Sequence, residues 1–204
     1  IESGSRHTTV ADCTICRGGR IRHSAVGVLI GDSPRNRIVR NHVSDFYYTG
    51  ISCGWVWGYG PTRTFDNRIE YNLIHDLGGG MLEDMAGIYL LGTQAGTVLR
   101  GNVIHDVSTY NYGGWGLYTD EGSYGITMEN NLVYMCKNSG FHQHYGKENI
   151  IRNNIFAFNL RSQLQATRIE DHRSLSFMNN IVYFDRGTLL SSNWHKFSLL
   201  TDYN

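Results

Sequence analysis

An internal repeat constrains this chain more than any other feature. An asparagine followed two residues later by Ile, Val or Phe recurs at steps of 31, 30, 29, 23 and 26 residues. The copies begin at Asn41, Asn72, Asn102, Asn131, Asn154 and Asn180. A glycine followed by an apolar residue alternates with them, at Gly27, Gly50, Gly87, Gly116 and Gly140, and Gln163 takes the same place once more. Repetition at such a period indicates an array of stacked structural units.

Each unit contains two or three short apolar or alternating segments separated by Gly, Asn, Asp and Ser, which is typical of strands joined by turns. No window shows sustained helical periodicity. The pattern predicts an all-β, single-stranded solenoid in which each unit is one coil of a parallel β-helix. Successive coils would pair in parallel about 4.8 Å apart, and stacked asparagines would form an amide ladder. The alternative, a β-sandwich, requires hairpin turns, and Asn-Gly and Asp-Gly pairs are absent.

The chain is expected to form one domain, residues 1–204. It begins without Met and stops in what reads as the start of another coil, and neither end carries a capping segment. We therefore expect the central fragment of a longer chain, truncated at both ends. Eighteen basic and eighteen acidic residues give a formal charge of zero, which argues against nucleic acid or an acidic membrane as partner. No segment is long enough for a transmembrane helix.

Loop lengths single out one face of the solenoid. The step from repeat Asn to the next repeat Gly is 9 residues for Asn41 and Asn131, but 15 for Asn72 and 14 for Asn102. The step from Gly to the next Asn is 14 or 15 in most units, but 22 after Gly50. Insertions in repeat proteins map to loops on one face, often the binding face. Here they would form walls on both sides of the strands that start at the repeat glycines.

The inserted segments contain aromatic rings and carboxylates, a combination that suits a carbohydrate. The apolar face of a sugar packs on a ring while its hydroxyls need polar partners. The alternative is that the rings pack on the solenoid wall. The candidate substrate-binding rings of the insertions are Trp55, Trp57, Tyr59 and Trp115.

Strand alternation defines the floor between the walls. The second and fourth residues after each repeat glycine should face outward. Stacking the coils then gives two outward columns, Tyr89, Tyr118, His142 and Gln165 in one, and Leu91, Asp120, His144 and Thr167 in the other. The polar and aromatic members Tyr89, Tyr118, His142, His144 and Gln165 are further substrate-binding candidates. Asp120 and His144 would lie one coil apart, within reach of a charge-assisted hydrogen bond.

Glycoside hydrolysis needs two carboxyl groups, one to protonate the leaving oxygen and one to act as nucleophile or base. We predict Asp84 and Asp120 as the pair, with Glu121 as the main rival. Their separation would distinguish inversion from retention, but Asp84 lies in an insertion of unknown path. His75-Asp76 and His105-Asp106 are interpreted as stacked turn residues, so no metal site is predicted, and no cofactor is required.

Two other functions remain open from the residues. A β-eliminating polysaccharide lyase would use a Lys or Arg base, here Lys147 or Arg152, beside a uronate and often with Ca²⁺. Zero net charge and the absence of a basic strip count against an anionic polymer. A non-catalytic glycan-binding solenoid would use the same aromatic rings without needing the acids.

Two long segments carry a resemblance to a known family. They are Trp115-Gly116-Leu117-Tyr118-Thr119-Asp120-Glu121-Gly122 and Phe141-His142-Gln143-His144-Tyr145-Gly146-Lys147-Glu148-Asn149. With flanking motifs they resemble, over about residues 70–195, bacterial right-handed parallel β-helix proteins grouped with glycoside hydrolase family 141. The resemblance implies a right-handed solenoid of the pectin-lyase-like fold. The resemblance implies α-L-fucosidase or xylanase activity on plant polysaccharides, through an acidic pair that would include Asp120 and Asp84. We expect a secreted or periplasmic monomer acting on an oligo- or polysaccharide.

Overall fold

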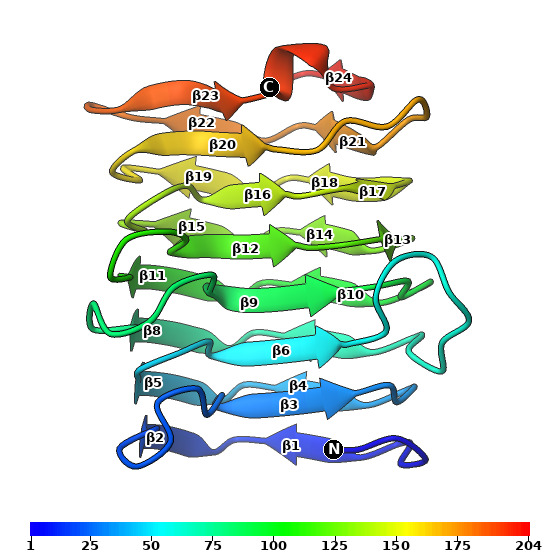
Figure 1. Cartoon of the computed structure of the whole chain (residues 1–204), viewed down its shortest axis with the longest axis vertical. Coiled ribbons are helices and arrows are strands. Elements are labelled where there is room, and N and C mark those ends of the chain that lie inside the picture. Colours follow the sequence, from blue (N-terminus) through cyan, green and yellow to red (C-terminus); the bar gives the residue numbers. More distant parts are fainter.

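The computed structural model describes residues 1–204 and is a right-handed parallel β-helix of about seven coils (Figure 1). Each full coil contributes one strand to each of three parallel sheets that run the length of the stack. The fold predicted from the repeat is therefore confirmed. The exceptions to this pattern are a two-stranded ladder of β13 (Ser123–Tyr124) and β17 (Gly146–Lys147), and one 3-10 turn, η1 (Trp194–Lys196).

We name the three sheets by their first strands. The β1 sheet contains β1 (Thr9–Ala11), β4 (Arg37–Val39), β7 (Arg68–Glu70), β10 (Val98–Arg100), β14 (Thr127–Glu129), β18 (Asn149–Arg152), β21 (Leu175–Met178) and β24 (Leu199–Asp202). The β2 sheet contains β2 (Thr14–Gly18), β5 (His42–Phe46), β8 (Leu73–Leu77), β11 (Val103–Val107), β15 (Leu132–Tyr134), β19 (Ile155–Ala157) and β22 (Ile181–Tyr183). The β3 sheet contains β3 (Val28–Gly31), β6 (Ile51–Gly54), β9 (Ala86–Leu91), β12 (Trp115–Thr119), β16 (Phe141–Gln143), β20 (Ser162–Ala166) and β23 (Thr188–Ser192).

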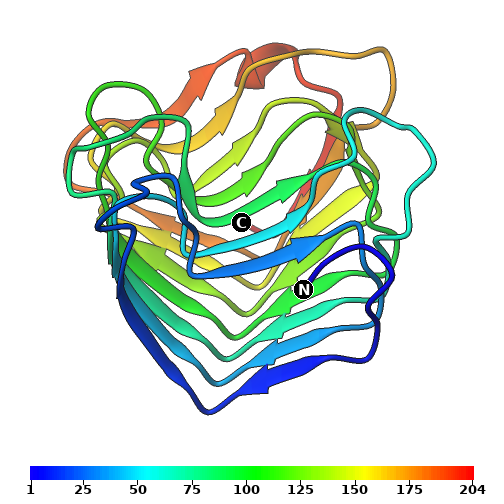
Figure 2. The ribbon, with the colours of Figure 1, turned by 60° about the horizontal axis from the view of Figure 1, so that its bottom comes forward.

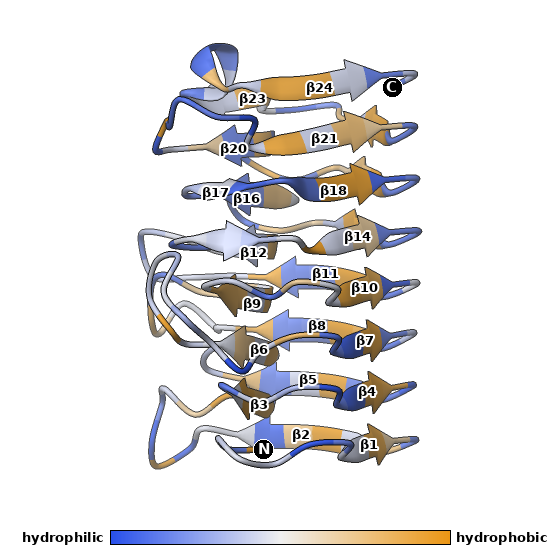
Figure 3. Ribbon diagram, turned by 90° about the vertical axis from the view of Figure 1, so that its right-hand side faces the viewer, coloured by the Kyte–Doolittle hydropathy of each residue, from blue (hydrophilic) through white to orange (hydrophobic).

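The core is a set of apolar columns, because equivalent residues of successive coils pair directly. In the β3 sheet Ile88 pairs with Leu117, which pairs with Phe141 and then with Leu164. These side chains belong to one cluster of 30 buried residues that runs along the inside of the solenoid. Apolar segments of the β1 sheet recur coil after coil in the same way (Figure 3). Burying such a side chain contributes about 1.5 to 3 kcal/mol.

The repeat asparagines form the predicted amide ladder at the corner between the β1 and β2 sheets. The Nδ2 of Asn72 donates to Oδ1 of Asn102 at 2.9 Å, and Asn102 donates to Asn131 at 2.9 Å. The same carbonyl oxygens accept the backbone N–H of the preceding coil's asparagine, at 3.0 Å in both steps. The ladder thus satisfies backbone groups at a buried corner that side chains of other types would leave unpaired.

The inserted loops form the two predicted walls beside the β3 sheet (Figures 1 and 2). The loops before β9 (residues 78–85) and before β12 (residues 108–114) rise on one side, and the long loop after β6 (residues 55–67) rises on the other. The β6–β7 loop lies tightly on the coils beside it. A Cβ on Gly92 would come within 2.0 Å of the Val56 carbonyl oxygen, and one on Gly122 within 2.2 Å of Gly58.

Candidate active-site cleft

A cleft of about 330 Å³ lies on the β3 sheet between the walls. Its lining comes from four successive coils and contains three carboxylates: Asp84, Asp120 and Glu121. Eight further residues complete it: Tyr48, Trp55, Trp57, Tyr89, Leu91, Tyr112, Tyr118 and His144. A larger apolar hollow at the C-terminal end of the stack is lined by core residues such as Phe177 and Trp194 and holds no carboxylate, so it offers no acid chemistry.

Asp84 is held in the cleft by its own backbone. It has a left-handed conformation, with φ of 50°. Its N–H donates to the Tyr112 carbonyl at 3.0 Å, and its carbonyl accepts from the Tyr48 hydroxyl at 2.9 Å. The carboxyl Oδ1 is buried without a hydrogen-bond partner. Burial, followed by the negative charge of Asp120, raises the pKa of Asp84 to about 6, and the Tyr118 hydroxyl acts in the opposite direction.

Asp120 directly follows β12 and is nearly buried. Its Oδ2 accepts a hydrogen bond from the Tyr89 hydroxyl at 2.6 Å, and its carbonyl accepts from Ser123 Oγ at 2.6 Å. These contacts fix both the side chain and the turn that carries it. Burial and the charge of Asp120 raise the pKa of the Tyr89 and Tyr118 hydroxyls, so both stay protonated hydrogen-bond donors on the cleft floor.

The expected hydrogen bond between Asp120 and His144 is not formed. Asp120 is engaged by Tyr89 of the coil before it, while His144 turns to Glu121 and Thr167. His144 Nε2 lies 4.0 Å from Glu121 Oε1, and its Nδ1 lies 2.8 Å from Thr167 Oγ1. Glu121 also lies 3.4 Å from the Tyr145 hydroxyl. Glu121 is more exposed than Asp120, so it sits at the rim of the cleft.

The aromatic lining divides into floor and walls. Tyr89 and Tyr118 pack in a tilted arrangement, with ring centroids 4.6 Å apart, and form the floor. Trp55 packs on Tyr89, and its indole N–H donates to Ser52 Oγ at 3.0 Å, which leaves the ring half-buried. Trp57 is 60% exposed and offers the freest ring.

Two wall residues, Tyr48 and Tyr112, are not among the candidates predicted from the sequence. Tyr48 lies just before a repeat glycine and Tyr112 lies inside an insertion. The aromatic content of that insertion was a usable signal for Tyr112. No periodicity marks Tyr48, because its position depends on how the chain enters β6.

Four sequence candidates lie elsewhere than expected. Trp115 and His142 are 0% exposed, and their rings pack in a tilted arrangement with centroids 4.3 Å apart. Gln165 is also buried and accepts a hydrogen bond from the Trp115 indole at 2.7 Å. They pack under and beside the floor because the loops cover this part of the sheet, so they support the cleft without lining it. Burial, followed by the proximity of His144, lowers the pKa of His142 well below its usual value. Tyr59 faces a separate pocket.

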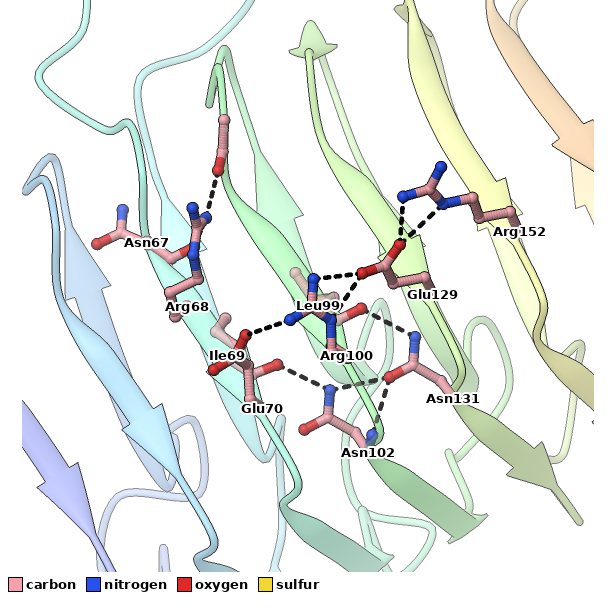
Figure 4. A network of polar contacts seen from close by, with 11 residues as sticks. Asn67, Arg68, Ile69, Glu70, Leu99, Arg100, Asn102, Glu129, Asn131 and Arg152 are labelled. Atoms are coloured by element: carbon pink, nitrogen blue, oxygen red, sulfur yellow. Dashed lines mark hydrogen bonds and ion pairs between the residues drawn. The ribbon is translucent and has the colours of Figure 1, made fainter.

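The basic residues of the lyase alternative do not reach the cleft. The Lys147 ammonium lies over the Tyr59 ring, 4.8 Å from its centroid, in that separate pocket. Arg152 lies on the β1 sheet, where its Nε donates to Glu129 at 2.8 Å (Figure 4). His144 is the one basic side chain in the lining, so the structure offers no Lys or Arg base beside the carboxylates.

The two His-Asp pairs form a stack on the outer face of the β2 sheet. They lie within β8 and β11 rather than in turns. The His75 and His105 rings are parallel with centroids 4.8 Å apart, and each Nδ1 bonds the adjacent aspartate, at 2.8 and 2.6 Å. No group of three or more His, Cys, Asp or Glu is arranged to hold a metal ion. None of the helices has the length and apolar character needed to cross a bilayer.

The fold and the cleft together define a parallel β-helix whose loop-walled face carries clustered carboxylates and aromatic rings. Residues 83–194 match the family described as the right-handed β-helix region, and the chain belongs to that family. This span includes most of the cleft lining.

One solved structure gives a more specific likeness. It is a glycoside hydrolase, 29% identical to this chain with a TM-score of 0.66. The match covers 73% of this chain and 25% of that protein, so the chain spans a quarter of the glycoside hydrolase's length. Among curated proteins, no match is found.

Proposed function

We propose that this β-helix is the catalytic region of a glycoside hydrolase and that its cleft cleaves a glycosidic bond. The observation that carries the proposal is the shared cleft of Asp84 and Asp120, in which burial and the charge of Asp120 raise the pKa of Asp84 to about 6. Glycosidases need one carboxyl group that stays protonated near neutral pH and a second carboxylate beside it. The likeness to a solved glycoside hydrolase supports the same chemistry.

The residues then take distinct roles. Asp84 is the general acid that protonates the leaving oxygen, and Asp120, oriented by Tyr89, is the nucleophile or the base towards water. Trp57, with Tyr112 from the opposite wall, binds the apolar faces of the sugar. Glu121 and His144 at the rim bind hydroxyl groups. Glu121 remains the rival for one of the two catalytic positions.

The substrate we propose is a complex plant glycan, with α-L-fucosidase-like or xylanase-like specificity as in glycoside hydrolase family 141. The sequence segments around Asp120 and His142, which resemble that family, support this more specific proposal. A cleft of about 330 Å³ holds only a few sugar-sized groups, which favours action on a terminal or branch residue. Such polymers lie outside cells, so we also propose a secreted or periplasmic protein.

The test is product analysis by mass and ultraviolet absorbance after incubating the protein with a panel of plant glycans. We expect a released saccharide whose mass is that of the corresponding residue in the glycan plus one water. Asp120→Asn should lower turnover at least about 100-fold while leaving the melting temperature near that of the wild type. An unsaturated product would instead indicate a lyase, binding without product a glycan-binding solenoid, and near-normal turnover of Asp120→Asn would remove Asp120 from the mechanism.

A further inference from the structure

A second pocket lies behind the β6–β7 loop, on the other side of the wall from the cleft. It has a volume of about 390 Å³ and is lined by residues of four successive coils. The lining residues are Tyr59, Thr62, Thr64, Phe65, Thr93, Ala95, Tyr124 and Lys147. It shares no residue with the cleft, although Trp57 and Tyr59 of the same loop face the cleft and the pocket respectively.

The pocket contains a cation, the Lys147 ammonium, that forms no ion pair within the protein. The Lys147 ammonium lies 4.8 Å from the Tyr59 ring centroid and 5.2 Å from that of Tyr124, within the range of cation–π attraction. No carboxylate lines the pocket, and Lys147 takes part in none of the ion pairs of the structure. An anionic ligand would supply the counter-charge that this ammonium lacks, in a charge-assisted hydrogen bond.

The pocket also has hydrogen-bonding capacity that the protein leaves unused. Thr64 is 1% exposed, and its hydroxyl has no hydrogen-bond partner. Buried hydroxyls are nearly always paired, so the Thr64 hydroxyl retains hydrogen-bonding capacity for a ligand. The Thr62 hydroxyl, by contrast, is already engaged by Asp32 at 2.7 Å. The Thr93 hydroxyl makes one long contact of 3.5 Å with a backbone carbonyl.

The walls of the pocket are fixed before any ligand binds. Tyr124 and Lys147 are register partners in the β13–β17 ladder. The Tyr59 hydroxyl donates to Glu170, which also lies 3.2 Å from His172 Nε2, so the β6–β7 loop is tied to a segment 111 residues away in the sequence. Preorganised groups bind with a smaller entropic cost than mobile ones.

We propose that this pocket binds a hexuronic acid residue, with its carboxylate on Lys147 and its hydroxyls on Thr64 and Thr93. A single ammonium matches one carboxylate. The volume exceeds that of a simple inorganic ion, and the threonine-rich lining suits a polyhydroxylated ring. The pocket would hold an acidic branch of the glycan while another part of it occupies the cleft.

The test is a titration, by nuclear magnetic resonance or calorimetry, of the Asp120→Asn protein with glucuronic and galacturonic acids. We expect saturable binding in about the millimolar range. Lys147→Met keeps the aliphatic stem on the tyrosines but removes the charge, and it should weaken binding by about tenfold or more. Lys196→Met, at an exposed cation outside every pocket, is the matched control and should leave binding unchanged. Thr64→Val should weaken it by about threefold at an unchanged melting temperature.

Glucose, galactose and inorganic sulfate separate the parts of the proposal. Binding of glucose as tight as that of glucuronate would overturn recognition of the carboxylate, and sulfate binding as tightly as glucuronate would overturn recognition of the sugar. Uronate binding that survives Lys147→Met would place the ligand elsewhere. Because the titration uses the Asp120→Asn protein, its outcome does not depend on the proposed hydrolysis. The product analysis reports on the cleft and the titration reports on the pocket, so either proposal can fail while the other holds.

Discussion

At the scale of single residues, the protonation of Asp84 gives the cleft a pH dependence. Its pKa is raised to about 6 by burial and by the charge of Asp120, so its carboxyl group loses its proton as the pH rises through 6. If Asp84 is the general acid, kcat/KM should fall about tenfold per pH unit above that value. Asp84→Asn should abolish this fall of kcat/KM with rising pH, together with most of the activity. If the fall of kcat/KM with rising pH persists in Asp84→Asn but disappears in Glu121→Gln, the general acid is Glu121.

The same residue predicts an effect on stability with a definite sign. A group whose folded pKa lies above its unfolded value of about 3.8 favours the folded state at low pH, and this contribution is lost as the pH rises through 6. Asp84→Asn should therefore raise the melting temperature at pH 8 and change it little at pH 4. Equal effects at both pH values would show that the Asp84 carboxylate is solvated in the cleft.

The exposure of individual side chains was the property that the sequence predicted least well. Alternation correctly placed Tyr89, Tyr118 and Asp120 on the outer face, because strand period alone decides which face a side chain takes. It could not say which outward residues the loops would cover. Trp115 and His142 were expected to bind substrate and are buried, since exposure on this face depends on the tertiary path of two insertions.

At the scale of elements, the asparagine ladder connects every coil to the next. Asn102 donates to the Ile69 carbonyl at 2.9 Å (Figure 4). Its Oδ1 accepts from both the backbone and the side chain of Asn72. Asn102→Ala would leave several buried polar groups unpaired, at a cost of about 1 to 3 kcal/mol each. We expect a loss of at least about 3 kcal/mol in unfolding free energy, measured by urea denaturation.

Asn111→Ala is the matched control for the ladder. Asn111 is exposed in the β11–β12 loop and its side chain makes no hydrogen bond within the protein, so the change should stay within about 0.5 kcal/mol. If Asn102→Ala cost no more than this control, water would be able to replace the ladder amide. The repeat predicted this ladder and the strand register because stacked coils place equivalent residues together. It did not predict the contribution of Tyr48, whose position lies outside the repeat pattern.

At the scale of the whole molecule, different faces of the solenoid have separate tasks. The face of the β3 sheet carries the cleft, whose lining runs from Tyr48 to His144 and so depends on the stacking of several coils. The outer face of the β1 sheet carries a charged ladder in which Glu129 lies between Arg100 and Arg152 of the neighbouring coils (Figure 4). In a solenoid, stability comes from contacts between nearest-neighbour coils. A change in this ladder should therefore alter stability without touching the chemistry.

Glu129→Gln tests that separation. Glu129 is 5% exposed, and burial opposes its ionisation, but the hydrogen bonds from Arg152 and Arg100 outweigh burial and hold its pKa below the usual value. A carboxylate with a depressed folded pKa stabilises the protein above its unfolded pKa of about 4.5, and the contribution is lost as the pH falls through the folded value. Glu129→Gln should therefore lose about 2 kcal/mol at pH 7, less at pH 3, and keep the wild-type kcat/KM at 25 °C. A parallel fall in kcat/KM at temperatures where the variant is fully folded would show that the two faces are coupled through the core.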